Sequence, residues 1–273
     1  MVRKLVYIVG LSHSGSTALD MLLTTGGKAV GLGQVWTVLN EDPATTQERI
    51  CSCGAAATEC ALWQPVIDQL KRLSGTATPR DRYRLVLQSV DRLYGPEISV
   101  IDSSKHAHRL AILKSELPEI SLTVLHNIKD VRPFTISTLD NSERKALGGD
   151  LPEKIFLQWY RDNRASYATA AALSGEPPLR VMYEGVCLAT EAVAGRLVSA
   201  LGEDYIDLDA DLNCGHTHII SGNRMRLRPD GKAKRLTYDH RWMARSEWLR
   251  PYMLLPMVRW YNERCLRELA QFA

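Results

Sequence analysis

Residues 5–17 read Leu-Val-Tyr-Ile-Val-Gly-Leu-Ser-His-Ser-Gly-Ser-Thr, an apolar run followed by a loop of glycine and serine. The unbroken apolar run at 5–9 is typical of a strand that is buried on both faces, as in a parallel sheet. Helical character begins at Thr17 and continues to Leu23. A strand, a glycine-bearing turn and a helix in this order point backbone N–H groups and the positive end of the helix at an anion.

Short apolar runs alternate with helical patterns along the rest of the chain. Strands are expected at 98–101, 121–125 and 179–182, and helices at 63–74, 80–94, 107–117, from 131, at 152–172 and at 188–201. This alternation indicates an α/β fold with a central parallel sheet flanked by helices. Since no linker or repeat divides the chain, we expect a single domain over residues 1–273. Two long irregular stretches, 40–62 and 209–235, are candidates for functional loops.

The composition is that of a folded globular protein. Of the 273 residues, 45% are hydrophobic and 24% are charged, which excludes a disordered chain and a collagen-like or coiled-coil rod. The net charge of +3 does not favour a nucleic-acid partner, although it leaves room for a local basic site for a small anion. No apolar run reaches the roughly 18 residues of a membrane span, and the run at 5–9 is too short for a signal peptide. We therefore expect a cytoplasmic protein.

The glycine spacing of the first loop, Gly10-x4-Gly15, matches the beginning of a nucleotide-triphosphate P-loop. A P-loop has a lysine directly after the second glycine, where it reaches the β- and γ-phosphates. This chain has Ser16 there. The loop is therefore expected to hold a phosphate without the γ-phosphate lysine. A turn that binds no ligand and a P-loop kinase or NTPase stay open as alternatives.

The segment 12–17, Ser-His-Ser-Gly-Ser-Thr, resembles the 5′-phosphosulfate loop of sulfotransferases that use 3′-phosphoadenosine 5′-phosphosulfate (PAPS). That loop reads Lys-Ser-Gly-Thr-Thr or Arg-Ser-Gly-Ser-Thr in the family, so a histidine stands here where Lys or Arg is usual. Because free histidine titrates near pH ~6.5, the charge at this position depends on pH. The resemblance implies a P-loop NTPase-like sulfotransferase fold and a 5′ site made of His13, Ser14, Gly15, Ser16 and Thr17.

Two later segments resemble further motifs of the same family. Lys129 precedes Ser137 by eight positions, the spacing of the basic residue and the serine in the 3′-phosphate motif. A cation at a strand end and a hydroxyl in the following helix can converge on one phosphate. Lys105 ends the segment Asp-Ser-Ser-Lys and resembles the lysine that contacts the transferring sulfuryl group. A fixed cation there stabilises the charge that develops on the leaving adenosine 3′,5′-bisphosphate.

The segment 216–226 resembles the loop that closes over the nucleotide in these enzymes. It lies in the irregular stretch 209–235, which is therefore expected to be a nucleotide-covering loop. The resemblance implies that Asn223 and Arg224 contact the nucleotide. Further arginines alternate with Arg224 at Arg226 and Arg228, so they need not all reach one anion.

Sulfuryl transfer needs an acceptor group in line with the sulfur and usually a base to take its proton. In related bacterial enzymes a Glu is a candidate base at the position where this chain has Gln34, which accepts no proton at neutral pH. We rank His106 first and His108 second as the base, because both lie beside Lys105. The candidate catalytic residues are thus Lys105, His106 and His13. A homologue that binds the nucleotide but has lost catalysis stays an alternative.

Cys51, Cys53 and Cys60 form a Cys-x-Cys-x6-Cys pattern in the stretch 40–62, and relatives carry a similar loop on the acceptor side. Zinc wants four ligands in a tetrahedral array. Further possible ligands follow at Cys214, His216 and His218. Neither the cysteines at 51–60 nor the residues at 214–218 have the familiar Cys-x2-Cys spacing of zinc sites. We therefore favour local packing or a labile disulfide and expect no metal.

The sequence thus predicts an enzyme that moves a sulfuryl group from PAPS to a hydroxyl or amine and releases adenosine 3′,5′-bisphosphate. The expected partner is a small-molecule or glycan acceptor. Ring-bearing natural products, carbohydrates, lipids and peptides all stay open as acceptors, and so does the oligomeric state.

Overall fold

The computed structural model describes residues 3–73, 77–140, 151–212, 215–227 and 234–270. A six-stranded sheet crosses the molecule in the order β5-β4-β1-β3-β2-β6, and each pair of neighbouring strands is parallel. The strands are β1 (Arg3–Gly10), β2 (Ala29–Gly31), β3 (Ser99–Lys105), β4 (Ile120–Ile128), β5 (Leu179–Met182) and β6 (His216–Thr217).

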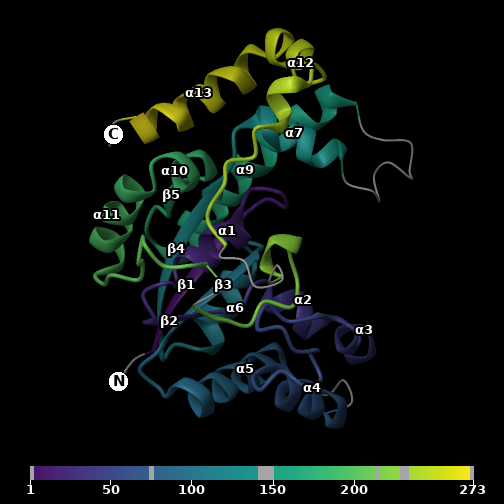
Figure 1. Ribbon diagram of the computed structural model, residues 1–273, viewed down its shortest axis with the longest axis vertical. Helices are drawn as coiled ribbons and strands as arrows, with labels where there is room; N and C mark the ends of the chain where they lie inside the picture. Colours follow the sequence, from purple (N-terminus) through teal and green to yellow (C-terminus); the bar gives the residue numbers. More distant parts are fainter. Residues whose placement is uncertain (1–2, 74–76, 141–150, 213–214, 228–233, 271–273) are drawn as a thin grey trace.

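Helices cover both faces of this sheet (Figure 1). They are α1 (Ser16–Leu22), α2 (Val35–Asn40), α3 (Pro43–Gln47), α4 (Trp63–Arg72), α5 (Pro79–Tyr94), α6 (Arg109–Glu116), α7 (Val131–Leu139), α9 (Pro152–Ser174), α10 (Tyr183–Leu188), α11 (Thr190–Leu201), α12 (Leu249–Leu254) and α13 (Pro256–Ala270), with two short 3-10 helices, η1 (Arg224–Arg226) and η2 (Arg241–Ala244). None of the described helices has both the length and the apolar character that crossing a membrane requires.

The central strand β1 is buried on both faces, as its apolar run predicts. Leu5 and Tyr7 pack into a core with α2, α4, α5 and α6, whereas Val6 and Ile8 pack against α1, α10 and α11. Burying one aliphatic side chain of this kind stabilises the fold by about 1.5–3 kcal/mol. A third core joins α7, α9 and α13. In Figure 1 α12 and α13 lie at the top and α4 and α5 at the bottom, with the sheet between them.

The predicted α/β class and the predicted elements are confirmed, with differences at their ends. The strand expected at 98–101 continues to Lys105, although its last residues are polar. These polar groups are buried and have partners in distant segments. Asp102 accepts a hydrogen bond from the Tyr83 hydroxyl at 2.9 Å, and Ser103 donates one to Asp20 at 2.7 Å. The helix expected at 188–201 corresponds to α11, which begins at Thr190, and a short helix that was not expected, α10, precedes it. The two irregular stretches contain short elements, α3 in 40–62 and β6 with η1 in 209–235.

Candidate active site

The carboxyl ends of β4, β1 and β3 lie beside one another, because these strands are neighbours in one parallel sheet. Open α/β sheets bind ligands at this edge, where the chain order changes direction across the sheet. A cavity of about 630 Å³ opens there. Of the residues expected from the sequence, its walls contain His13, Gly15, Ser16, Thr17, Lys105, Lys129, Ser137 and Asn223.

The loop after β1 is held in a shape that only small residues permit. Gly10 has φ 153°, and a Cβ there would collide with the carbonyl oxygen of Asn127. Gly15 has φ 87°, and its Cβ would meet the ring of Tyr183. The Asn127 amide donates to the carbonyl oxygen of Ser14 at 2.8 Å and to its hydroxyl at 3.1 Å. Ser14 is thereby turned into the protein, so its side chain supports the loop instead of facing the cavity.

The two expected phosphate motifs meet in the structure. His13, with φ 68°, brings its Nδ1 to 3.4 Å from the Ser137 hydroxyl on α7. Lys129 is almost fully buried, and its Nζ lies 4.6 Å from the centre of the Tyr183 ring and 3.9 Å from an oxygen of Asp239. Burial lowers the pKa of Lys129, although Asp239 partly offsets that effect. A buried cation of this kind is stabilised further when an anion enters the cavity.

The structure adds a cation that no motif indicates. Arg241 lines the cavity and is fixed by two hydrogen bonds of 2.8 Å to the carboxylate of Asp239. These hydrogen bonds, helped by the charge of Lys129, lower the pKa of Asp239 to about 2. By contrast, Arg224 is exposed and is not among the described residues that line this cavity. Arg228 lies outside the described residues.

Residues 222–223, in the segment expected to cover the nucleotide, contact the helix that follows the β1 loop. The backbone N–H of Asn223 donates to the Thr17 hydroxyl at 3.4 Å. The side chain of Asn223 accepts from the N–H of Met225 at 2.9 Å and so caps η1. Gly222 approaches Thr17 and Gln34 so closely that a Cβ would lie 3.1 Å from the Thr17 hydroxyl. These contacts hold residues 222–223 in the wall of the cavity.

A second cavity, of about 530 Å³, adjoins the first. Four residues line both cavities, namely Ser12, His13, Gln34 and Lys105. The other lining residues of the second cavity are partly apolar, such as Phe134 and Ile155, and partly polar. Such a mixture suits an organic molecule that packs its apolar part against these side chains and is oriented by a few polar groups.

Lys105 lies at the junction of the two cavities and has the unusual φ of 72°. Few residues other than glycine adopt this conformation, and those that do are concentrated at functional sites. Burial lowers the pKa of Lys105 to about 8. The ammonium is therefore still largely protonated at neutral pH.

The histidines beside Lys105 differ in position. His106 lines the second cavity, and desolvation together with the nearby charges of His108 and Arg109 lowers its pKa. A neutral imidazole at this place can accept a proton. His108 does not line this cavity; both imidazoles are exposed and pack against each other, with ring centroids 5.4 Å apart. Sequence reasoning missed Asp162 of α9, which also lines the second cavity and accepts a hydrogen bond of 2.9 Å from Arg161. The face of α9 on which Asp162 lies depends on how this long helix packs.

The fold is similar to that of the sulfotransferase domain from the Synechococcus PCC 7002 olefin synthase, with a TM-score of 0.54 and 14% identity over 93% of this chain and 94% of that domain. A sulfotransferase domain from the curacin biosynthetic pathway matches 93% of this chain and 98% of its own length, at 16% identity and a TM-score of 0.49. No family model and no curated protein sequence matches this chain. The likeness to the olefin synthase domain confirms the predicted sulfotransferase-like fold.

Proposed function

We propose that this chain is a sulfotransferase that binds PAPS in the first cavity and an acceptor in the second. The observation that carries the proposal is the junction of the two cavities at His13, Gln34 and Lys105. A donor in one cavity and an acceptor in the other would meet at this junction. Bringing two reactants together in this way supplies much of the rate of a group transfer.

The first cavity suits a nucleotide that carries two phosphate groups. Its volume lies within the usual range of ligand sites, about 300–1,000 Å³. Lys105, Lys129 and Arg241 line it from three different segments. The backbone N–H groups of 15–17 would bind the 5′-phosphosulfate, because the first N–H groups of a helix have no acceptor within it. Lys129 and Ser137 would bind the 3′-phosphate.

The transfer forms a bond between the acceptor oxygen or nitrogen and the sulfur, and it breaks the bond between that sulfur and the 5′-phosphate oxygen. Lys105 would stabilise the charge that gathers on this leaving oxygen. His106 would take the proton of the acceptor, since its lowered pKa keeps it neutral at pH 7. Gln34 accepts no proton, so at the junction it would orient the acceptor through its amide.

One observation favours a second candidate, a homologue that binds the nucleotide without catalysis. Gln34 lies at the junction, where the resembling enzymes have a candidate base. In that protein the first cavity would bind adenosine 3′,5′-bisphosphate, but no acceptor would be sulfated. A P-loop kinase is disfavoured because Ser16 occupies the place of the γ-phosphate lysine.

Calorimetric titration with adenosine 3′,5′-bisphosphate, beside ATP with Mg²⁺, tests the nucleotide site. We expect micromolar binding of the bisphosphate and none of ATP. Lys129→Ala should weaken binding about 10- to 100-fold, because a hydrogen bond to a charged group contributes about 1.5–3 kcal/mol. Lys114→Ala is the matched control, since Lys114 is an exposed lysine of α6. Binding of ATP instead of the bisphosphate would revive the kinase interpretation.

Incubation with PAPS and a mixed panel of phenols, sugars and amines then distinguishes the two candidate functions, sulfuryl transfer and nucleotide binding without catalysis. Release of adenosine 3′,5′-bisphosphate that depends on an acceptor supports the sulfotransferase. Tight binding of the bisphosphate without turnover on any acceptor supports the catalytically impaired homologue.

A further inference from the structure

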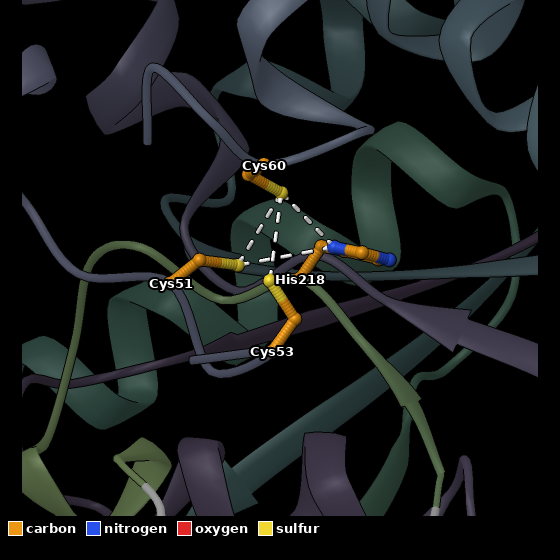
Figure 2. Close-up of side chains that lie close together, drawn as sticks. All are labelled: Cys51, Cys53, Cys60 and His218. Carbon is orange, nitrogen blue, oxygen red and sulfur yellow. Dashed lines mark hydrogen bonds between the residues drawn. The ribbon is translucent and has the colours of Figure 1, made fainter. Parts of the chain in front are cut away.

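Three cysteines and one histidine point toward one another near the β6 edge of the sheet, the edge opposite β5 (Figure 2). Cys51, Cys53 and Cys60 come from the segment between α3 and α4, and His218 follows β6. Their three sulfurs and the Nδ1 of His218 all lie within 4.8 Å of one another. Cys51, Cys60 and His218 are buried, and Cys53 is half-buried.

Four of the six separations between these atoms are close to the edges of a metal-centred tetrahedron, and the other two lie within 4.8 Å. The Cys60 sulfur lies 3.6 Å from that of Cys51 and 3.8 Å from that of Cys53. The Nδ1 of His218 lies 3.1 Å from the Cys60 sulfur and 3.8 Å from the Cys51 sulfur. With zinc bonds of about 2.3 Å to sulfur and about 2.0 Å to nitrogen, a tetrahedral site has S–S edges near ~3.8 Å and S–N edges near ~3.5 Å.

The imidazole of His218 is oriented from its far side. Its Nε2 lies 2.6 Å from the hydroxyl of Tyr94, the last residue of α5. When Nε2 donates its proton to this hydroxyl, Nδ1 is left unprotonated and faces the sulfurs. Metal-binding histidines usually have such an outer partner, which fixes the ring and its tautomer. His216 lies against Tyr94 instead, with ring centroids 4.8 Å apart, and Cys214 lies outside the described residues.

Backbone hydrogen bonds hold the two contributing segments together beside the cluster. Ser52 donates its N–H to the carbonyl of Ile219 at 3.0 Å, and its hydroxyl accepts from the N–H of Ile219 at 2.8 Å. The indole of Trp63 donates to the carbonyl of His218. The four side chains are therefore presented by a prearranged backbone and not by chance contacts between loops.

We propose that Cys51, Cys53, Cys60 and His218 bind one Zn²⁺ in a closed, structural site. Three thiolates and one imidazole are the soft ligands that select zinc, and each thiol releases its proton as the metal binds. Four protein ligands leave no position for water or substrate, which distinguishes a structural site from a catalytic one. The proposal replaces the expectation of packing or a disulfide, which rested on the unfamiliar Cys-x-Cys spacing.

The zinc would fasten the covering segment of the first cavity. His218 comes three residues before Ser221, which lines that cavity together with Gly222 and Asn223. The metal joins this segment to the cysteine loop, and Arg226 adds a hydrogen bond of 3.5 Å to the carbonyl of Ile50. Loss of zinc is therefore expected to loosen the cover as well as to destabilise the fold.

Metal analysis of the untagged full-length protein, purified with zinc and a thiol reductant and then gel-filtered, tests the proposal. We expect about one zinc per chain, bound by four protein ligands. Cys60→Ser and His218→Ala should each lose most of it. Cys187→Ser is the control and should keep the wild-type content, because Cys187 is a free cysteine outside the cluster. A wild-type content below about a tenth of this stoichiometry, or an unchanged content in Cys60→Ser, overturns the proposal.

A measurement on the wild-type protein keeps the test valid if the variants do not fold. Replacement of zinc by Co²⁺ should produce the visible and near-ultraviolet bands of a tetrahedral thiolate complex. A strong chelator should release the metal, lower the unfolding temperature and expose three thiols to a thiol reagent. Co²⁺ bands without thiolate charge transfer, or a disulfide among the three cysteines in the reduced preparation, would exclude the site.

Discussion

Lys105 is the residue on which the proposed chemistry depends most. Its left-handed backbone, with φ 72°, ends β3 and turns the side chain to the place where the two cavities meet. Burial lowers its pKa to about 8, because water no longer stabilises the ammonium fully. The same buried position thus brings the ammonium to the junction and lowers its pKa.

The pKa of Lys105 predicts where the rate of the proposed reaction falls at alkaline pH. Below about pH 8 the free protein carries the ammonium, and above it the charge that would stabilise the leaving oxygen is lost. We expect kcat/KM for PAPS to fall above about pH 8, although an ordinary lysine keeps its charge to about pH 10. Lys105→Arg should move this fall to higher pH. A profile for the wild type that stays flat up to pH ~10 would contradict the assignment.

The proton acceptor is tested by a pair of substitutions in the second cavity. His106→Gln should lower kcat by about 100-fold, the usual contribution of a general base. The affinity for adenosine 3′,5′-bisphosphate should stay within about twofold, because His106 lines the second cavity and not the first. Asp162→Asn is the comparison, since Asp162 lines the same cavity. If Asp162→Asn loses the rate and His106→Gln keeps it, the role belongs to Asp162.

The element that shapes the proposed nucleotide site is the turn between β1 and α1. Its two glycines allow the backbone to approach Asn127 on one side and Tyr183 on the other. The turn thus packs directly against β4 and α10. Packing against these two neighbours therefore decides the shape of the turn.

Gly15→Ala should therefore cost both stability and binding. The new Cβ would be strained at φ 87° and would also collide with Tyr183, so we expect a loss of about 2–4 kcal/mol in the free energy of unfolding. Gly175→Ala is the matched control, since Gly175 has φ 82° and open space around it. It should cost only about 1 kcal/mol of strain. Urea unfolding measures both, and equal losses would show that Tyr183 does not constrain the turn.

At the scale of the whole molecule, the nucleotide would bridge segments that are far apart in the sequence. The first cavity is lined by residues of the β1 loop, by Ser137 of α7, by residues 221–223, and by Asp239 and Arg241. A ligand that binds only the folded chain stabilises all of these segments at once. The single domain expected over residues 1–273 stays a prediction, and one cooperative unfolding transition would support it.

Adenosine 3′,5′-bisphosphate should raise the unfolding temperature. At a 100-fold excess over its Kd the stabilisation is about 2.7 kcal/mol, which corresponds to about 5–10 °C for a chain of this size. Differential scanning fluorimetry measures the shift. AMP, which lacks the 3′-phosphate, should give a clearly smaller shift, and Lys129→Ala should abolish the difference between the two. Equal shifts with both nucleotides in the wild type would argue against a 3′-phosphate site at Lys129.

The local sequence determined the central part of this protein. The apolar run of β1, the glycine spacing and the order of strands and helices indicated a parallel sheet. The resemblance to sulfotransferase motifs placed Lys105 and Lys129 beside the β1 loop, and the cavity contains both. These features depend on short-range patterns and on a topology that has few alternatives.

Other features were decided only by the tertiary structure. Arg241 and Asp162 come to the cavities through the direction in which a loop and a helix face, which no short motif encodes. His218 meets Cys51 and Cys60 from more than 150 residues away. Contacts of this kind depend on which buried surfaces of distant segments pack together, and the free energy of that packing belongs to the folded chain as a whole.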